Sequence, residues 1–360
     1  MPLKTTSRVE KLRRKLEQQA VDAILISQPE NRYYLSGFTG SSGFLLITSK
    51  DKVLATDFRY IEQVKIEASD YEILKIAGGP DKWIPELLSA HNITRLGFEA
   101  EDLTVSICHL FTDILCKVSP GLEFIPLEGI VESLRAIKEV SETDLIRRAI
   151  AITDSATEYI EDTIHAGMTE KELAWSIETY LRENGSESLP FEIIVASGPN
   201  AALPHARPSA RAIGEGEPVI IDMGARYEGY SSDISRTFYI GPADETYIRV
   251  YDTVRRAQEE AIMYIKAGIT GGEADQLSRK IIEQAGYGEA FGHSLGHGIG
   301  LACHELPRLG PGSNERLTDG MVFTIEPGIY LSGWGGVRIE DDVTIENGAV
   351  KVLSQAWRTI

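Results

Sequence analysis

The first third of the chain alternates short apolar segments with turns and polar segments. Apolar residues recur at helical spacing within residues 8–20, which predicts an amphipathic helix at the start of the chain. These are Val9, Leu12, Leu16 and Ala20. Runs rich in aliphatic residues, separated by turns that contain Gly and Asp, then predict strands. The runs are residues 23–26, 44–48, 53–56, 71–76 and 95–98, and a polar helix is expected at 81–90. The alternation predicts a mixed α/β domain of residues 1–130.

A domain boundary is expected where Pro120, Pro126 and Gly129 cluster. Ser141 and Asp144 follow this cluster and open a long helical segment with a start like that of a capping box. We therefore assign residues 131–360 to a second domain.

Two segments of the second domain share helix start and stop signals. HAGMTEKELAWSIETYLRENG (165–185) aligns with KAGITGGEADQLSRKIIEQAG (266–286) at an offset of 101 residues, with five identities in 21 positions. The identities are Ala-Gly before the helix, Thr at the N-cap, Glu three residues later and Gly at the end. This placement favours an internal duplication, although two unrelated helices with common capping signals would give the same pattern.

A predicted β-hairpin with two acidic residues follows each of these segments. In VIIDMGARYEGYSSDIS (219–235), Asp222 and Asp233 stand on either side of the expected turn. In MVFTIEPGIYLSGWGGVRIEDDVTI, Glu326 and Glu340 are symmetric about Gly333. We expect the two carboxylates of each pair to face each other across the hairpin, where like charges destabilise strand pairing.

The surroundings of these acids favour a metal centre. Asp222 and Glu326 each end an apolar run, so both carboxylates should be at least partly buried, where an unpaired charge costs several kcal/mol or shifts its pKa. Arg236 and Arg338 are near in sequence but would leave a net negative charge, whereas two divalent cations would neutralise all four acids. Two metals about 3.5–4 Å apart, bridged by carboxylates, hold and deprotonate a water in aminopeptidases and phosphatases.

Histidines are concentrated between the second repeat and its hairpin. The segment FGHSLGHGIGLACHELP contains His293, His297 and His304, and His205 lies upstream in the same domain. The glycines around His297 allow the backbone to approach a bound ion or substrate closely. Four carboxylates and one imidazole favour manganese, cobalt or zinc over copper.

Composition excludes several functional classes. The formal net charge of -18 argues against a nucleic-acid or anionic-membrane partner. Three cysteines, Cys108, Cys116 and Cys303, do not suit a disulfide framework and fit a reducing compartment. No apolar run reaches the roughly 20 residues needed to span a bilayer, and the N-terminus lacks the apolar core of a signal peptide. A cytoplasmic protein is therefore predicted.

These motifs resemble those of the pita-bread metallopeptidases, specifically the Xaa-Pro peptidases that include prolidase and aminopeptidase P. The family pattern of Asp, Asp, His, Glu and Glu is matched by Asp222, Asp233, His297, Glu326 and Glu340. The resemblance extends through ASGPNAALPHARPS to NRYYLSGFTGSSGFLLIT and TDFRYIEQ, and so covers essentially the whole chain. It implies an α/β (α+β) fold, in which a creatinase-type N-terminal domain precedes a pseudo-two-fold pita-bread domain with a curved antiparallel sheet covered by helices.

The resemblance also implies a set of metal ligands. Asp233, His297 and Glu326 would surround one of two divalent ions, with manganese expected first and cobalt or zinc as alternatives. Asp222 would hold the second ion, and Asp233 and Glu340 would bridge the two. Glu326 would in addition accept the proton of the water held between them.

Further residues match positions that contact the substrate in the family. His205 and His304 match the histidines that contact the substrate and stabilise the tetrahedral intermediate. Arg338 matches an arginine near the substrate, for which a simple counter-ion role is the alternative. His293 matches a histidine behind the ligands and is also assigned to substrate binding.

The implied reaction is hydrolysis of the peptide bond before proline by a hydroxide that bridges the two metals. The substrate would be a small peptide with proline in second position. A creatinase-like C–N hydrolase shares the fold, but its family has lost the metal set. Methionine aminopeptidase shares the five ligands, but it would leave residues 1–130 without a purpose. A non-catalytic pita-bread binding module is the alternative from another class, although it has no need for an intact metal cage.

Three properties of the implied enzyme stay open in the sequence. A dipeptidase acting on Xaa-Pro must recognise the carboxylate of proline, for which Arg207 is a candidate, whereas an aminopeptidase acting on Xaa-Pro-Yaa needs space there. The sequence favours the aminopeptidase or general Xaa-Pro peptidase slightly. A homodimer is expected, with the N-terminal domain either closing the cleft or forming the interface. Exposed aromatic residues are candidates for that contact, namely Tyr33, Tyr34, Phe38 and Tyr60.

Overall fold

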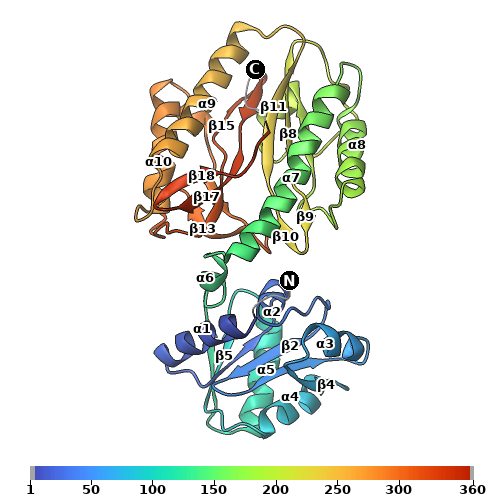
Figure 1. Cartoon of the computed structure of the whole chain (residues 1–360), viewed down its shortest axis with the longest axis vertical. Helices are drawn as coiled ribbons and strands as arrows, with labels where there is room; N and C mark the ends of the chain where they lie inside the picture. The colour runs from blue at the N-terminus through green and yellow to red at the C-terminus, as the bar shows by residue number, and fades with distance from the viewer. Residues whose placement is uncertain (1–4, 357–360) are drawn as a thin grey trace. The chain divides into compact units, whose positions relative to one another are not determined.

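The computed structural model describes residues 5–356, and the chain divides into two compact units, residues 1–135 and 136–360. The first unit (blue to cyan in Figure 1) contains a six-stranded sheet in the order β4-β3-β2-β1-β5-β6. Its strands are β1 (Ala23–Ile26), β2 (Phe44–Thr48), β3 (Lys52–Thr56), β4 (Glu72–Lys75), β5 (Arg95–Glu99) and β6 (Glu123–Leu127). Strand β2 is antiparallel to both neighbours, whereas β1 and β5 are parallel. The predicted mixed sheet is confirmed, and all five predicted strands are present.

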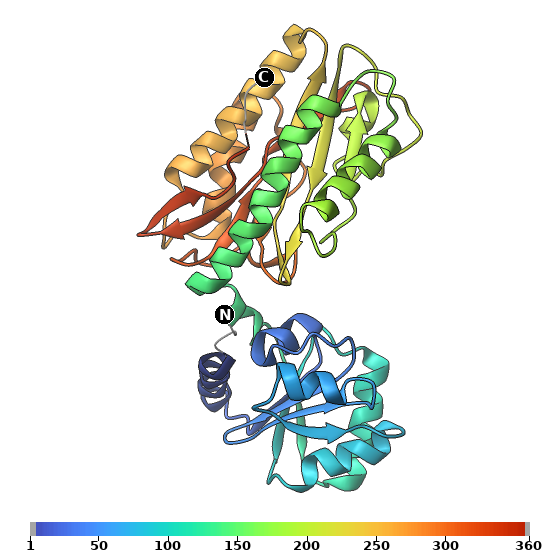
Figure 2. The same cartoon turned by 45° about the vertical axis from the view of Figure 1, so that its right-hand side comes forward.

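Helices cover this sheet (Figure 2), and sequence reasoning found only two of them. They are α1 (Thr5–Gln18), α2 (Pro29–Ser36), α3 (Ile61–Glu67), α4 (Pro80–Ser89), α5 (Val105–Val118) and α6 (Glu132–Arg135). The helix expected at 8–20 ends earlier, at Gln18, because Ala20 adopts a left-handed conformation with φ 53° and is exposed. Helix α5 escaped prediction although Thr104 caps it by accepting a hydrogen bond from Ile107 N.

The aromatic side chains expected at the surface of this unit are partly in its core. Tyr34 is fully buried, with the Arg8 guanidinium 4.2 Å from its ring centroid, and Phe38 is 1% exposed. The prediction that Tyr34 and Phe38 contact a partner is therefore wrong, because both rings are used inside their own unit.

The second unit is built from antiparallel strands. One sheet has the order β11-β8-β7 and the other the order β13-β12-β14-β17-β18, with two separate hairpins, β9-β10 and β15-β16. The first sheet and its hairpin contain β7 (Ile194–Ser197), β8 (Glu217–Met223), β9 (Arg226–Tyr227), β10 (Tyr230–Ser231) and β11 (Ile234–Ile240). The second sheet and its hairpin contain β12 (Gly296–Gly298), β13 (Glu305–Leu309), β14 (Val322–Ile325), β15 (Gly328–Leu331), β16 (Gly335–Arg338), β17 (Asp341–Glu346) and β18 (Ala349–Val352).

Each half of this unit contributes two helices that pack on its strands. Helices α7 (Val140–Thr163) and α8 (Glu170–Glu183) contact the first half, and α9 (Glu245–Tyr264) and α10 (Gly271–Gln284) contact the second. Figures 1 and 2 show α7 and α9 as the long helices of the two halves. Short 3-10 turns, η1 (Gly198–Ala202) and η2 (Gly288–Ala290), complete the unit. The predicted antiparallel, helix-covered architecture is confirmed.

The shared helix signals predicted for the repeat are confirmed in detail. Helices α8 and α10 have the same length and are offset by 101 residues, because 271 − 170 and 284 − 183 both equal 101. Thr169 and Thr270 each form a capping box with the Glu three residues later. The start predicted for α7 is shifted, however: Glu139, and not Ser141, is the N-cap, and its N–H donates to Glu142 Oε2 at 2.9 Å.

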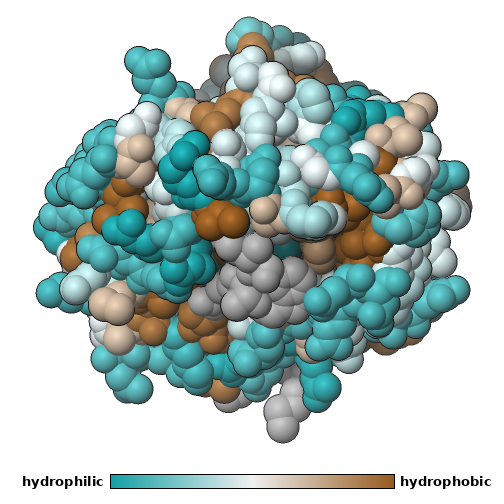
Figure 3. All heavy atoms as spheres, turned by 90° about the horizontal axis from the view of Figure 1, so that it is seen from above, coloured by the Kyte–Doolittle hydropathy of each residue, from teal (hydrophilic) through white to brown (hydrophobic). Residues whose placement is uncertain are grey.

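The surface is largely hydrophilic on the face shown in Figure 3. Figure 3 shows one face on which hydrophilic side chains predominate and apolar side chains form separate small patches. Within residues 5–356, none of the helices combines the length and the apolar character needed to cross a membrane.

Candidate metal centre

The first acidic hairpin has a register that differs from the predicted one. Strands β8 and β11 place Asp222 opposite Ser235, and β9 and β10 continue the same register up to the turn. The turn residues Glu228 and Gly229 both have positive φ, 45° and 81°, as a type I′ turn requires. The turn therefore lies one residue later than the midpoint between Asp222 and Asp233, and the prediction that these two acids face each other is wrong. They are diagonal neighbours instead.

The second acidic hairpin has the predicted register. Ile325 pairs with Asp341, and Gly328 pairs with Arg338, so Glu326 and Glu340 stand opposite each other in one continuous register. Gly333 in the connecting turn has a φ of 80°, which favours glycine. The predicted pairing of these two carboxylates is confirmed.

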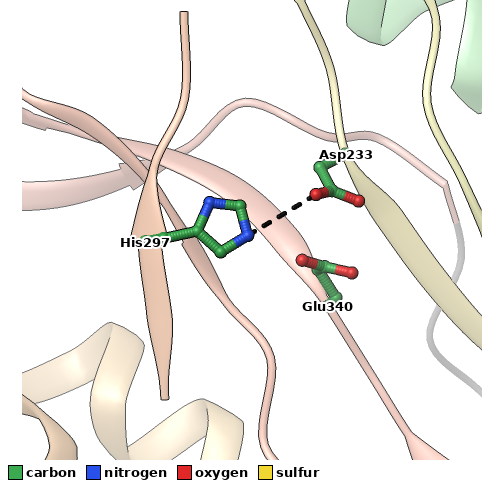
Figure 4. A group of neighbouring side chains, drawn as sticks. All are labelled: Asp233, His297 and Glu340. Atoms are coloured by element: carbon green, nitrogen blue, oxygen red, sulfur yellow. Dashed lines mark ion pairs between the residues drawn. The ribbon is translucent and has the colours of Figure 1, made fainter. Parts of the chain in front are cut away.

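The structure brings all five predicted ligands together. Donor atoms of Asp233, His297 and Glu340 lie within 4.8 Å of one another, as Figure 4 shows. His297 Nε2 lies 3.6 Å from Asp233 Oδ2 and 3.5 Å from Glu326 Oε1. Asp222 lines the same cavity, which has a volume of about 580 Å³.

These acids are buried to different degrees, and burial changes their protonation. Asp233 and Glu340 are 5% and 1% exposed, and the side chains of Asp222 and Glu326 are 14% and 17% exposed, so the predicted partial burial is confirmed. Burial raises the pKa of Asp233 and Glu340 well above the ordinary range, and the neighbouring carboxylates raise it further. Burial also raises the pKa of Glu326 to about 8. The Arg338 guanidinium lowers the pKa of Glu326 and Glu340 without restoring either to its ordinary value, so the cluster lacks sufficient compensating positive charge.

The histidine in the cluster presents a lone pair to these carboxylates. Its Nδ1 lies 3.1 Å from the carbonyl oxygen of Gly298, which can only accept, so Nδ1 carries the proton and donates the hydrogen bond. Burial lowers the pKa of His297 to about 4, so the ring is neutral at pH 7 and Nε2 carries no proton. A lone pair that points at two carboxylate oxygens is repulsive unless a proton or a metal cation lies between them.

The donor set fits divalent metal ions. Asp222 Oδ1 is buried without a hydrogen-bond partner, which is costly for a carboxylate oxygen unless a cation binds it. Carboxylate oxygens combined with one imidazole nitrogen suit manganese, cobalt or zinc. The residues present therefore match the metal centre that the sequence predicts.

Of the two arginines considered as counter-ions, Arg338 contacts the carboxylate of one of the four acids directly. Arg338 donates from Nη2 to Asp222 Oδ2 at 2.6 Å and from Nε to Ser235 Oγ at 2.8 Å. Its contact with Asp222 supports the counter-ion alternative. Arg338 nevertheless lines the cavity, so it also remains a candidate for contact with the substrate. Arg236 forms its ion pair with Asp341 at 2.8 Å instead.

The remaining predicted site residues line the same cavity. His205 and His304 are exposed, and the ring of His304 lies 4.2 Å from that of His297 between centroids. His293 lies deeper, and burial lowers its pKa to about 4. The structure thus gathers His205, His293, His304 and Arg338 around the acids, and their contacts with a substrate stay predictions.

Sequence reasoning missed Tyr330, which links two of these residues. Its hydroxyl lies 2.9 Å from His293 Nε2 and accepts a hydrogen bond from Arg338 Nη1 at 2.9 Å. Burial raises the pKa of Tyr330 to about 12, so the phenol is protonated at neutral pH. No pattern in the sequence marks this residue, because only tertiary packing places it between His293 and Arg338.

We expect Tyr330→Phe to lower kcat/KM about tenfold, because a hydrogen bond to a charged group contributes about 1.5 kcal/mol. The variant leaves the carboxylates and His297 untouched, so its metal content should equal that of the wild type. Steady-state kinetics and metal analysis of both proteins would check this. Tyr264→Phe, on an exposed side chain at the end of α9, is the matched control and should have no effect.

Comparison with known proteins agrees with this site. Residues 144–347 match the model of metallopeptidase family M24, and residues 8–137 match the creatinase/prolidase N-terminal domain. A protein named Xaa-Pro dipeptidase from Pyrococcus horikoshii is 37% identical over 355 residues, which cover 98% of each chain. The solved structure of an Xaa-Pro dipeptidase from Bacillus anthracis matches with 40% identity and a TM-score of 0.95, covering 99% of each chain. That of an X-Pro aminopeptidase from Thermotoga maritima matches with 37% identity and a TM-score of 0.88, covering 98% of this chain and 99% of that one.

Proposed function

The chain belongs to metallopeptidase family M24, and on this basis we propose that it hydrolyses the peptide bond that precedes proline in Xaa-Pro dipeptides. The observation that carries the proposal is the cavity itself, in which five metal-type ligands and two exposed histidines lie beside arginine side chains. Similar proteins named Xaa-Pro dipeptidase support the same substrate class.

We propose a dinuclear centre of divalent ions, most readily manganese. Asp233, His297 and Glu326 would hold one ion, Asp222 would hold the other, and Asp233 and Glu340 would be shared. When bound, the ions supply positive charge that polarises the scissile carbonyl and lowers the pKa of the attacking water.

The protein's own groups would handle the proton and the developing charge. Glu326 stands at the edge of the cluster, less buried than Asp233 or Glu340, and would accept the proton of the attacking water. It would then return this proton to the proline nitrogen as the bond breaks. His205 and His304 would donate hydrogen bonds to the carbonyl oxygen, which favours the transition state over the ground state because negative charge grows there.

The cationic side chains of the cavity support recognition of a free carboxylate. Arg207, Arg308 and Arg338 line it, and Arg338 is engaged with Asp222. Arg207 lies 3.5 Å from Glu192, but both side chains are largely exposed, and such a pair contributes little. Arg207 and Arg308 are therefore the candidates for binding the carboxylate of proline in a dipeptide. Arg308 was missed by sequence reasoning.

A comparison of Ala-Pro with Ala-Pro amide and Ala-Pro-Ala tests the substrate length. We expect kcat/KM to be at least about tenfold higher for Ala-Pro, since a lost charge-assisted hydrogen bond costs about 1.5 kcal/mol or more. Arg207→Gln and Arg308→Gln should lower the rate on Ala-Pro and leave the rate on the amide unchanged. Equal or faster hydrolysis of the tripeptide would identify an aminopeptidase instead.

The reaction class is tested by metal content and proline dependence together. The manganese-loaded protein should hydrolyse Ala-Pro and leave Ala-Ala essentially uncleaved. A protein that binds no divalent metal and cleaves no proline peptide would be the non-catalytic binding module.

We also propose a homodimer, which a monomeric mass in solution at assay concentration would contradict.

A further inference from the structure

His205 stands on a segment whose two ends meet at one buried carboxylate. We call residues 198–208 the His205 loop; it begins after β7 and contains η1. Glu170, the first residue of α8, is fully buried beneath it. Its Oε1 accepts hydrogen bonds from Ser197 N and Ser197 Oγ, both at 2.8 Å, and its Oε2 accepts from Ser209 N at 3.0 Å and Ser209 Oγ at 2.6 Å.

A fifth donor comes from within the loop. Asn200 Nδ2 lies 3.0 Å from Glu170 Oε1. Oε1 thus accepts from the start of the loop, whereas Oε2 accepts from its end and also from Asn200 Nδ2 at 3.2 Å. Burial alone would raise the pKa of Glu170, but the hydrogen bonds from Ser209 and Ser197 hold the pKa below its ordinary value, so the group is ionised at neutral pH.

The position of the His205 ring depends on the backbone of this loop. His205 is exposed, and within residues 5–356 its ring has no hydrogen bond from a neighbouring side chain. The loop is held between its ends by small contacts: Ala201 and Ala206 are buried, and Pro204 O accepts from Arg338 Nη1 at 3.1 Å. In addition to these contacts, five donors bind Glu170 and hold both ends of the loop.

A helix-capping role does not account for Glu170. Glu172, two residues later, already provides the cap: it accepts from Thr169 N and Thr169 Oγ1, both at 2.8 Å, at the exposed surface. The bonds of Glu170 go to residues 197–209 instead. At the equivalent position in the repeat stands Gly271, where a Cβ would come within 2.0 Å of the Arg308 carbonyl. The second half therefore uses close backbone contact where the first half uses a buried carboxylate.

We propose that Glu170 is a positioning residue for the reaction, which fixes the His205 imidazole in the cavity by binding both ends of the His205 loop. The assignment rests on the proposed function for its catalytic consequence. Its structural consequence, a loop held at both ends, does not depend on the identity of the substrate.

Glu170→Gln is the test variant, and Glu172→Gln is its matched control. Glutamine keeps the volume of Glu170, but its amide nitrogen would face a donor at Ser197 or Ser209. The main-chain bonds from Glu170 N to Arg211 O and from Lys171 N to Ser209 O remain, so the unit should fold. Ser209→Ala, which removes one donor only, serves as a second variant should Glu170→Gln not fold.

Hydrogen–deuterium exchange of the metal-loaded protein measures directly how firmly the backbone of the His205 loop is held. Peptides covering residues 198–209 should exchange faster in Glu170→Gln than in the wild type, and Glu172→Gln should match the wild type there. Unchanged exchange in both Glu170→Gln and Ser209→Ala would overturn the proposal. This readout holds even if the protein cleaves no proline peptide, which would count against the proposed function alone.

A double-mutant cycle separates positioning from general destabilisation. Glu170→Gln should lower kcat/KM on Ala-Pro by about 10- to 100-fold, as expected when a catalytic group is displaced by about 1 Å. In a His205→Ala background the same change should cost less than about twofold, because the group to be positioned is gone. Losses that multiply in the double variant would mean that Glu170 does not act through His205, and the proposal would fail.

Discussion

Replacing Asp233 by Asn is expected to abolish hydrolysis while leaving the metal-free protein at least as stable as the wild type. Asp233 lies at the centre of the cluster, with His297 Nε2 at 3.6 Å and the carboxylates of Glu340, Asp222, Asp342 and Glu326 as its electrostatic neighbours. A neutral amide offers one acceptor oxygen where the proposed dinuclear centre would require an anion shared by two cations. Loss of a residue that only supports a ligand already costs about 10- to 100-fold, so kcat should fall by more than 100-fold.

The predicted stability of the metal-free variant follows from charge repulsion among the carboxylates when no metal is bound. Without cations, the charge of Asp233 is unfavourable in the folded protein, and Asn removes it. The main-chain N–H of Asp233 keeps its bond to Asp342 Oδ2 at 3.0 Å, so the local backbone stays fixed. Thermal unfolding of the chelator-treated variant and wild type, with metal content and kinetics of both, would measure the two effects.

Asp244→Asn is the matched control for this isosteric change. Asp244 caps α9 by accepting from Tyr247 N at 2.7 Å, and Asn caps a helix about equally well. Activity, metal content and stability should all equal those of the wild type. Full turnover by Asp233→Asn would refute its assignment as a bridging ligand, and a clear loss of stability in the metal-free form would refute the repulsion argument.

The two hairpins show how far the sequence determines such a site. The symmetry of the two acids about a glycine-rich turn was enough to pair Glu326 with Glu340, because Gly333 stands midway between them and the turn forms there. The same reasoning misplaced Asp233 relative to Asp222, because the turn is set by Glu228 and Gly229 and not by the symmetry of the acids. A one-residue shift of a turn changes every pairing by two positions. The diagonal arrangement nevertheless keeps both carboxylates near the cluster.

Residues that act through tertiary contacts left no signal in the sequence. Glu170 is an acid in the first turn of a helix, where acids are common, and only the fold brings Ser197 and Ser209 to it. The five candidate ligands were identifiable for the opposite reason: unpaired acids and a glycine-flanked histidine contradict ordinary folding preferences, and such contradictions mark candidate functional sites.

In the metal-free protein, the free energy of unfolding is expected to fall as pH rises from about 6.5 to about 8. Burial raises the pKa of Glu326 from 4.5 in the unfolded chain to about 8 in the folded protein, and it raises the pKa of Asp233 and Glu340 as well. An acid whose pKa is higher in the folded state stabilises the fold fully below its unfolded pKa, and this contribution is lost as pH rises to the folded pKa.

The histidines define the lower limit of this window. Burial lowers the pKa of His293 and His297 from 6.5 to about 4, so acidification below pH 6.5 protonates them in the unfolded chain first and destabilises the fold. As pH rises past 6.5 these rings become neutral in both states, and the acids then dominate the change in stability. Across this window Glu326 alone would contribute a loss of about 1–2 kcal/mol, equivalent to a fall in Tm of about 2–8 °C.

The measurement is the difference in Tm between the metal-loaded and the chelator-treated protein at each pH. Glu99, in the first unit, has a pKa raised by burial to about 7 and adds a decline of its own, but this decline is common to both forms and cancels in the difference. With metal bound, the carboxylates are held ionised, and affinity increases as protons cease to compete. The difference should therefore widen from pH 6.5 to 8, and a constant difference would show that these acids are not ligands.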